Sequence, residues 1–190
     1  MLSKVSNVLV VLSGPSGVGK GTIADIIKKS MNMALSISCT TRLPREKEEH
    51  GKHYFFISKE QFSEKIEQNG FLEYSSHFEN FYGTPKDFVL DKLKTQDVIL
   101  EIDVNGGLNV KKNLPSAVLI MILPPSLQEL ESRLKNRNTE TEEQIKTRLK
   151  RISYELDKKD LYDYVVVNDK LEKAVEDVEN IIKLEKNKEK

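Results

Sequence analysis

The sequence has little of several features that mark particular classes of protein. It contains one cysteine, Cys39, so no disulfide can form within the chain, and we expect a reducing compartment. Its 30 basic residues balance its 30 acidic residues, which excludes the strongly basic character of a general nucleic-acid or membrane-surface binder. The longest apolar run, 117–125, is too short to cross a bilayer, and the beginning of the chain does not resemble a signal peptide. We therefore predict a cytoplasmic protein with no nucleic-acid or membrane partner.

Short apolar segments alternate with helical patterns along much of the chain. The apolar segments are rich in Val, Ile and Leu, which is typical of strands covered on both faces of a parallel sheet; they are residues 8–12, 35–38, 98–103, 118–123 and 164–167. The helical patterns cover residues 19–30, 126–137, 141–158 and 170–184. This alternation predicts an α/β fold with a five-stranded parallel sheet between two layers of helices.

Two stretches interrupt this alternation. Residues 38–88 mix glycine, proline, aromatic and charged residues, and we expect an insertion with a small structure of its own. Residues 126–157 are helical, strongly charged and rich in arginine, which makes them a candidate mobile lid. We therefore predict one domain of 190 residues whose core comprises 1–37, 89–125 and 158–190.

A glycine-rich segment follows the first predicted strand and opens the first predicted helix. It reads Gly14-Pro15-Ser16-Gly17-Val18-Gly19-Lys20-Gly21-Thr22, and its Gly-x-x-x-x-Gly-Lys pattern in this setting predicts a P-loop. Glycines let backbone N–H groups curl around an anion, the helix start adds unpaired N–H groups, and Lys20 reaches the terminal phosphates. We predict that these nine residues bind the triphosphate of a nucleotide.

The P-loop departs from the usual pattern immediately after its lysine. A serine or threonine hydroxyl normally contacts Mg²⁺ there, but this chain has Gly21, with Thr22 next. Either Thr22 takes over this contact or water and phosphate hold most of the metal, which Mg²⁺ accepts because it keeps several waters.

A series of further motifs runs along the chain in a fixed order. They are Thr40-Thr41-Arg42-Leu43-Pro44-Arg45, then Glu48, Gly51 and Tyr54, then Glu73-Tyr74, Asn80-Phe81-Tyr82-Gly83-Thr84, Glu101-Ile102-Asp103 with Gly106, the arginines 133, 137 and 148, and Asn168-Asp169. Together with the P-loop they resemble the guanylate kinases from the first strand nearly to the end of the chain. The resemblance implies a P-loop NTPase-type fold with a GMP-binding insertion and a helical lid. It also implies ATP-dependent, Mg²⁺-assisted phosphorylation of GMP, and of dGMP, in purine nucleotide metabolism and GMP recycling.

The phosphate of GMP needs a cationic clamp, because phosphoryl transfer depends on alignment and charge neutralisation. Arg42 and Arg45, three residues apart, carry guanidinium groups that suit a phosphate. The resemblance adds Tyr54 and Tyr82 as hydroxyl donors, and it places two further residues, Ser38 and Glu48, in the same GMP-binding set.

The guanine base needs a different partner. Its N1–H and its N2 amino group are neighbouring donors that one carboxylate can accept, whereas adenine has an acceptor at N1. The resemblance assigns this contact to Glu73 and places Thr84 near guanine O6. Because an unpaired buried carboxylate is costly, discrimination against AMP of about 10⁴-fold is within reach.

Acidic residues also follow the strand predicted at 98–103. Glu101 and Asp103 are two residues apart, so they point to one side of that strand, at the edge of the sheet where α/β proteins bind ligands. We assign Asp103 to the metal and its water shell and Glu101 to the GMP side, although these two roles are interchangeable on the sequence.

The predicted lid carries three arginines that the resemblance places on the transferred phosphoryl group. Arg133 and Arg137 are four residues apart and share one helix face, and Arg148 lies on the following helix. The resemblance also puts Asn168 and Asp169 near the adenine end of ATP. The predicted catalytic set is Lys20, Arg42, Asp103, Arg133, Arg137 and Arg148.

Two other functions stay open on the sequence. The ending Gly21-Thr22 also resembles the P-loop of adenylate kinases, which favours another nucleoside monophosphate kinase. A non-catalytic guanylate-kinase-like module that binds peptides is the other alternative, but such modules generally lose the phosphate cradle. Substrate comparison separates these readings, and the sequence leaves the choice between monomer and homodimer open.

Overall fold

The computed structural model of the chain describes residues 7–77, 79–130, 150 and 152–188. A five-stranded sheet in the order β2-β7-β1-β8-β9 forms its centre. Its strands are β1 (Leu9–Ser13), β2 (Ala34–Leu35), β7 (Val98–Glu101), β8 (Val118–Leu123) and β9 (Tyr164–Val167). Every neighbouring pair in this sheet is parallel. The predicted α/β class and five-stranded parallel sheet are therefore confirmed.

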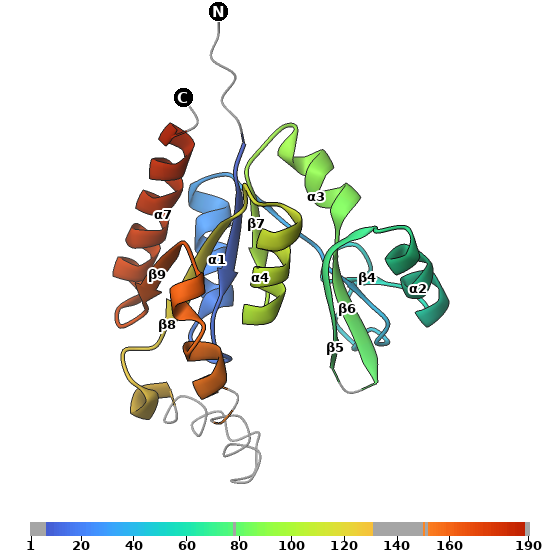
Figure 1. The fold of residues 1–190 in the computed structure, drawn as a ribbon, viewed down its shortest axis with the longest axis horizontal. Helices are drawn as coiled ribbons and strands as arrows, with labels where there is room; N and C mark the ends of the chain where they lie inside the picture. Colours follow the sequence, from blue (N-terminus) through green and yellow to red (C-terminus); the bar gives the residue numbers. More distant parts are fainter. Residues whose placement is uncertain (1–6, 78, 131–149, 151, 189–190) are drawn as a thin grey trace, which may run out of the picture.

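Helices cover both faces of this sheet, because successive side chains of a strand point to opposite faces. Val10 and Leu12 of β1 belong to a core shared with α1 (Lys20–Ser30) and α7 (Leu171–Lys188). Leu9 and Val11 belong to a second core shared with α4 (Val104–Asn113). The result is three layers, in which the sheet lies between α4 and the pair α1 and α7 (Figure 1).

A second, smaller sheet lies to one side of this core (Figure 1). Its strand order is β4-β3-β6-β5. The strands are β3 (Cys39–Thr40), β4 (Phe55–Phe56), β5 (Phe71–His77) and β6 (Asn80–Pro85), and β5 and β6 form an antiparallel pair. Helix α3 (Lys86–Leu93) follows β6 directly and leads back to the core. These strands lie within the predicted insertion 38–88; the division of the chain into core, insertion and lid stays a prediction.

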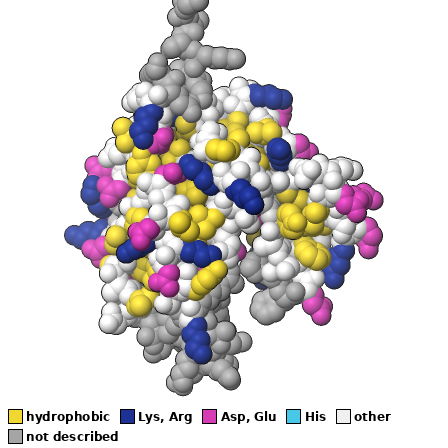
Figure 2. Space-filling model, viewed as in Figure 1, with side chains coloured by type: hydrophobic (Ala, Val, Ile, Leu, Met, Phe, Trp, Pro, Cys, Tyr) yellow, Lys and Arg dark blue, Asp and Glu magenta, His cyan; other side chains and the backbone are white. Residues whose placement is uncertain are grey.

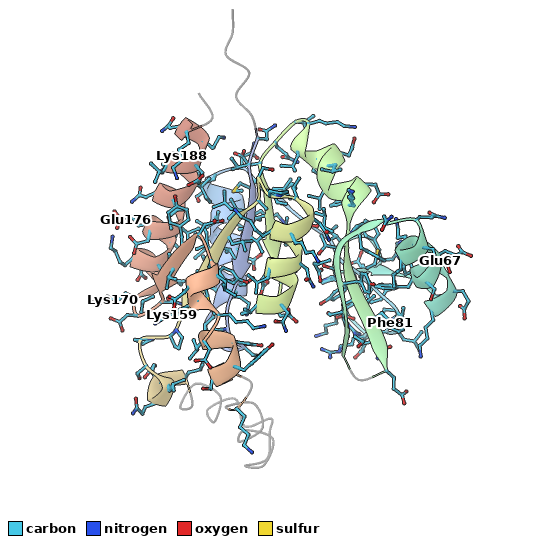
Figure 3. The ribbon with its side chains drawn as sticks, in the orientation of Figure 1. Glu67, Phe81, Lys159, Lys170, Glu176 and Lys188 are labelled. Carbon is cyan, nitrogen blue, oxygen red and sulfur yellow. The ribbon has the colours of Figure 1, made fainter. Side chains whose placement is uncertain are left out.

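The second sheet has a small aromatic core beneath helix α2 (Lys59–Glu67). Phe62 is buried and stacks on Phe71 at 4.5 Å and on Phe81 at 5.5 Å between ring centroids. Ser58 caps α2, and its hydroxyl and the side chain of Gln61 exchange hydrogen bonds with each other's backbone N–H. Figure 3 labels Phe81 on β6, well apart from Lys170 and Lys188 near the two ends of α7.

Several helices were not predicted. They are α2, α3 and α4. Helix α4 has glycines at 106 and 107 in its first turn, and glycine is a poor helix former. It forms because Asp103 caps it, with Oδ1 accepting the Gly106 N–H at 2.8 Å, and because it packs on the sheet. The strand predicted to reach Asp103 therefore ends earlier, at Glu101.

The predicted helices of the lid fall mostly outside the described residues. Within 126–137, residues 127–130 are helical, and the Ser126 hydroxyl accepts the Glu129 N–H at 3.1 Å, as an N-cap does. Within 141–158, residues 150 and 152–156 are helical, and the short 3₁₀ helix η1 (Lys159–Leu161) follows.

The surface carries both signs of charge. Figure 2 shows lysine and arginine interspersed with aspartate and glutamate over the face in view. Across the part of the chain that the structure describes, no helix has both the length and the apolar character needed to span a bilayer.

Candidate active site

The predicted phosphate cradle connects β1 to α1. Gly14 has φ 145°, and a Cβ there would lie 2.2 Å from the Ile122 carbonyl oxygen, so only glycine fits this turn. Gly19 caps α1 in the left-handed conformation, with φ 92°. Lys20 reaches back over the loop, and its Nζ donates to the carbonyl oxygens of Gly14 at 2.8 Å and Pro15 at 3.2 Å. The loop thus has the curled shape, and the lysine the location, that phosphate binding requires.

Asn168 holds this cradle from the far end of the chain. Its Nδ2 donates to the Val18 carbonyl at 2.7 Å, and its own N–H bonds to the Leu123 carbonyl at 2.8 Å. A Cβ on Gly19 would lie only 2.6 Å from the same Nδ2 atom. The side chain is buried, so its amide supports the loop from behind. Its predicted place near adenine stays a prediction.

The helix that follows the loop has no hydroxyl directly after Lys20. A Cβ on Gly21 would lie 3.3 Å from Glu101 Oε2, so the Glu101 carboxylate lies against the start of α1. Partial burial raises the pKa of Glu101, and the charge of Lys20 opposes this shift. Thr22, the predicted alternative metal contact, is exposed.

A cavity of about 250 Å³ lies between the carboxyl end of β7 and the second sheet. It brings together six residues predicted to bind GMP or the metal: Ser38, Tyr54, Glu73, Tyr82, Glu101 and Asp103. The cavity is also lined by Ser75, Gly83 and Ile102, which were not predicted as contacts. Ser75 lies two residues beyond Glu73 on β5 and faces the same side, so recognising that strand would have found it.

Glu73 lies deep in this cavity. Its side chain is 7% exposed, and its Oε1 accepts a hydrogen bond from the Thr84 hydroxyl at 2.6 Å. The pairing of β5 with β6 places these two residues directly opposite each other. Burial raises the pKa of Glu73 to about 7, against the opposing effect of the Thr84 hydrogen bond.

A glycine that was not predicted as a contact makes room for this carboxylate. A Cβ on Gly106 would lie 3.1 Å from Glu73 Oε2 and 3.4 Å from Asp103 Oδ1. Gly106 is three residues after Asp103, at the spacing of a helix cap. The first turn of α4 therefore fits between the two carboxylates.

Arg42 and Glu48 form an ion pair beside the cavity. Arg42 Nη2 lies 2.9 Å from Glu48 Oε2, and the Arg45 N–H donates to the same carboxylate at 2.8 Å. These contacts hold the pKa of Glu48 below its ordinary value, with the Arg45 N–H bond as the largest cause. Arg42 also lies over the Tyr54 ring at 5.7 Å, and Tyr54 meets Tyr82 edge to face. Glu48 therefore orients the arginine in this structure.

The predicted cationic residues lie in different parts of the chain and differ in exposure. Arg42 lies beside the cavity, whereas the side chain of Arg45 is exposed. Arg133, Arg137 and Arg148 lie outside the described residues. Within residues 7–77, 79–130, 150 and 152–188, no group of three or more His, Cys, Asp or Glu is arranged to hold a metal ion.

Known proteins resemble this chain over almost its whole length. The family model described as guanylate kinase matches residues 6–185. The guanylate kinase of Clostridium tetani is 50% identical over 179 residues, which cover 94% of this chain and 86% of that protein. The guanylate kinase of Caldanaerobacter subterraneus subsp. tengcongensis is 50% identical over 188 residues, which cover 98% of this chain and 91% of its own.

Solved structures show the same relationship. The crystal structure of guanylate kinase from Anaplasma phagocytophilum superposes with a TM-score of 0.75 at 31% identity, covering 98% of this chain and 89% of that one. A shikimate kinase from Bacteroides thetaiotaomicron, at 12% identity and a TM-score of 0.51, shares the fold alone. Because the family model matches nearly the whole sequence and two relatives are 50% identical to it, the chain belongs to the guanylate kinase family.

Proposed function

We propose that this protein transfers the γ-phosphoryl group of ATP to GMP, giving ADP and GDP, and that dGMP is accepted in the same way. The observation that carries this proposal is the buried Glu73–Thr84 pair in a cavity next to an intact P-loop. A phosphate cradle alone supports many kinases. A buried carboxylate beside the cradle favours a phosphoryl acceptor whose nucleobase carries hydrogen-bond donors.

Guanine satisfies Glu73 better than other bases do. Its N1–H and N2 amino group are adjacent donors, and an ionised carboxylate accepts both. Adenine would place its N1 acceptor against the same carboxylate, leaving a buried charge unpaired, which is costly. The hydrogen bond from Thr84 at 2.6 Å fixes the carboxylate before the base arrives. We place Thr84 close to guanine O6 as well.

The phosphate of GMP binds on the arginine side of the cavity. Arg42 is already oriented by Glu48 and by the Tyr54 ring. In our proposal Arg42, Arg45 and the hydroxyls of Tyr54, Tyr82 and Ser38 hold this phosphate, while Glu48 acts through Arg42. An arginine side chain that is already held in place loses less conformational entropy when it binds its ligand.

The phosphates of ATP bind in the cradle. Lys20 now donates to two loop carbonyls, and we propose that it turns to the terminal phosphates when ATP binds. Arg133, Arg137 and Arg148 of the proposed lid then contact the transferred phosphoryl group. Arginines in that position contribute about 10³–10⁵-fold to the rate of such reactions.

The fold family implies Mg²⁺, and the chemistry of the donor groups fits it. Thr22 in the first turn of α1 offers a hydroxyl, and Glu101 and Asp103, which line the cavity, offer carboxylates. Mg²⁺ prefers oxygen ligands and keeps several waters, so few protein ligands are needed. When bound, the ion neutralises charge on the phosphates.

A purified-enzyme assay with ATP and each of GMP, dGMP, AMP and UMP tests the proposal. We expect GDP and dGDP formation to dominate by several orders of magnitude. Preference for AMP would favour the other nucleoside monophosphate kinases instead. Absence of turnover together with tight peptide binding would favour a non-catalytic module. A cytoplasmic location stays a prediction.

A further inference from the structure

The cavity proposed for GMP contains one polar side chain to which neither base, phosphate nor metal has been assigned. Among the described residues that line the cavity, this side chain is Ser75. The base is assigned to Glu73 and Thr84 and the phosphate to the arginine side, whereas the sugar that joins them has no assigned partner. A serine hydroxyl both donates and accepts hydrogen bonds, as a ribose hydroxyl does.

The pairing of β5 with β6 arranges the cavity face of the second sheet in two rows. Glu73 lies opposite Thr84 in one row, and Ser75 lies opposite Tyr82 in the next. Residues two apart on a strand face the same side and lie about 7 Å from each other. The first row is the one proposed for the base, so the second row lies one step further along β5.

The proposed phosphate clamp lies on the side of the second row. The Tyr82 ring meets the Tyr54 ring at 6.0 Å between centroids, and the Arg42 guanidinium lies over Tyr54 at 5.7 Å. The long side chain of Tyr82 therefore extends to the clamp, whereas the short side chain of Ser75 stays close to the sheet and is half-buried. A sugar that joins a base on the first row to a phosphate in this clamp passes over Ser75.

We propose that the Ser75 hydroxyl forms a hydrogen bond with a ribose hydroxyl of GMP and so makes the protein prefer GMP to deoxy analogues. This inference rests on the proposed use of GMP and adds a contact to it. An analogue without that hydroxyl is still phosphorylated, because the contacts to its base and phosphate are kept. We expect its kcat/KM to be lower by about three- to tenfold, which corresponds to one neutral hydrogen bond.

The test compares GMP with its 2′-deoxy and 3′-deoxy analogues as acceptors at saturating ATP. In the natural protein we expect a lower kcat/KM for at least one analogue, and that analogue identifies the hydroxyl in contact. In Ser75→Ala, kcat/KM for GMP should fall by about three- to tenfold, to the value for that analogue, whose own kcat/KM should change little. The change should be in the KM for GMP with kcat kept, because the contact is the same before and during transfer.

Two further variants make the outcome specific. Ser76→Ala removes the same hydroxyl from the next residue, which is exposed and pairs with Phe81. Because neighbouring residues of a strand point to opposite faces, this variant should keep the natural preference for GMP. Ser75→Thr keeps a hydroxyl at position 75 and should keep most of the preference.

Equal kcat/KM for GMP and both analogues in the natural protein would overturn the assignment of Ser75, and so would a preference that persists in Ser75→Ala. Equal losses for all three acceptors in Ser75→Ala would also overturn it, because they would indicate a packing role alone. Failure of the natural protein to phosphorylate GMP at all would instead overturn the proposed function. The two failures are therefore distinguishable.

Discussion

The two sheets of this protein bind, in our proposal, the two substrates by opposite means. The core sheet presents a loop whose backbone curls around phosphates, and its side chains are almost all apolar. The second sheet presents side chains, with Glu73, Tyr82 and Thr84 on adjacent antiparallel strands. Phosphate is common to many nucleotides, so backbone recognition suits it. A particular base needs particular side chains.

The two regions also differ in how they are stabilised. The core is built on continuous buried strands with helices on both faces. The second sheet rests on a small cluster around Phe62, Phe71 and Cys39. Burial raises the pKa of the Cys39 thiol to about 11, so this cysteine is a packing residue with little thiolate character. A small core is easier to perturb, so the acceptor side should respond to changes that leave the donor side intact.

We expect the largest effect from a substitution in the phosphate cradle, on the ATP side of the site. Lys20→Met removes the cation that already lies over the loop, and we expect kcat to fall by at least about 10²–10³-fold, as for loss of one preorganised electrostatic group. A coupled spectrophotometric assay measures kcat, and circular dichroism confirms folding. GMP affinity should be nearly unchanged. Full activity in this variant would contradict the P-loop mechanism.

The next effect breaks the acceptor side. Glu73→Gln keeps the shape but replaces one acceptor oxygen by an amide donor facing guanine. We expect kcat/KM for GMP to fall by about 10³-fold, within the discrimination that buried polar groups provide. The KM for ATP is the internal reference and should change little. Equal losses for both nucleotides would remove the specific role of Glu73. Glu67→Gln, at the exposed last residue of α2, removes the same charge away from the cavity and is the matched control.

A pH titration sharpens the comparison without changing the fold. The pKa of Glu73 is raised to about 7, and guanine binding needs the ionised form. Above this pH the carboxylate is ionised; below it a proton must leave first, so GMP affinity should fall by up to about tenfold per pH unit as the pH drops below 7. Isothermal titration calorimetry between pH 5.5 and 8.5 measures this change in GMP affinity. Glu73→Gln should lose the Glu73 component and keep only the titration of the GMP phosphate, so an identical profile in both proteins would refute the assignment.

The smallest effect concerns the support of the cradle. Asn168→Ala leaves the Val18 carbonyl without its buried donor, at a cost of about 1–3 kcal/mol. We expect ATP affinity to fall several-fold while GMP affinity is kept. The substitution Lys170→Ala, at a nearby exposed position, is the control and should bind ATP normally. Equal GMP and ATP losses in Asn168→Ala would point to general destabilisation.

Elements that depend on a local sequence pattern were predicted, whereas elements that depend on contacts between distant segments were not. Most strands of the core were predicted because runs such as 118–123 are apolar on both faces, and that pattern is local. The strand predicted at 35–38 is observed only as β2 (Ala34–Leu35), which forms by pairing with β7. The short strands β3 and β4, two residues each, carry no such pattern and form only by pairing with distant segments. Helix α4 was missed because its stability comes from the Asp103 cap and from packing rather than from its glycine-containing sequence.

The site divides in the same way. By itself, the sequence determined that a phosphate cradle would form at Gly14 to Thr22, because a strand, glycines and a helix start are contiguous along the chain. Only the tertiary structure decided that Asn168 supports this loop from 150 residues away and that Gly106 makes room for Glu73. It also decided that Glu101 occupies the space left by Gly21. Each of these is a contact between segments brought together by strand pairing or by the packing of α4 against β5, and no local pattern encodes such a contact.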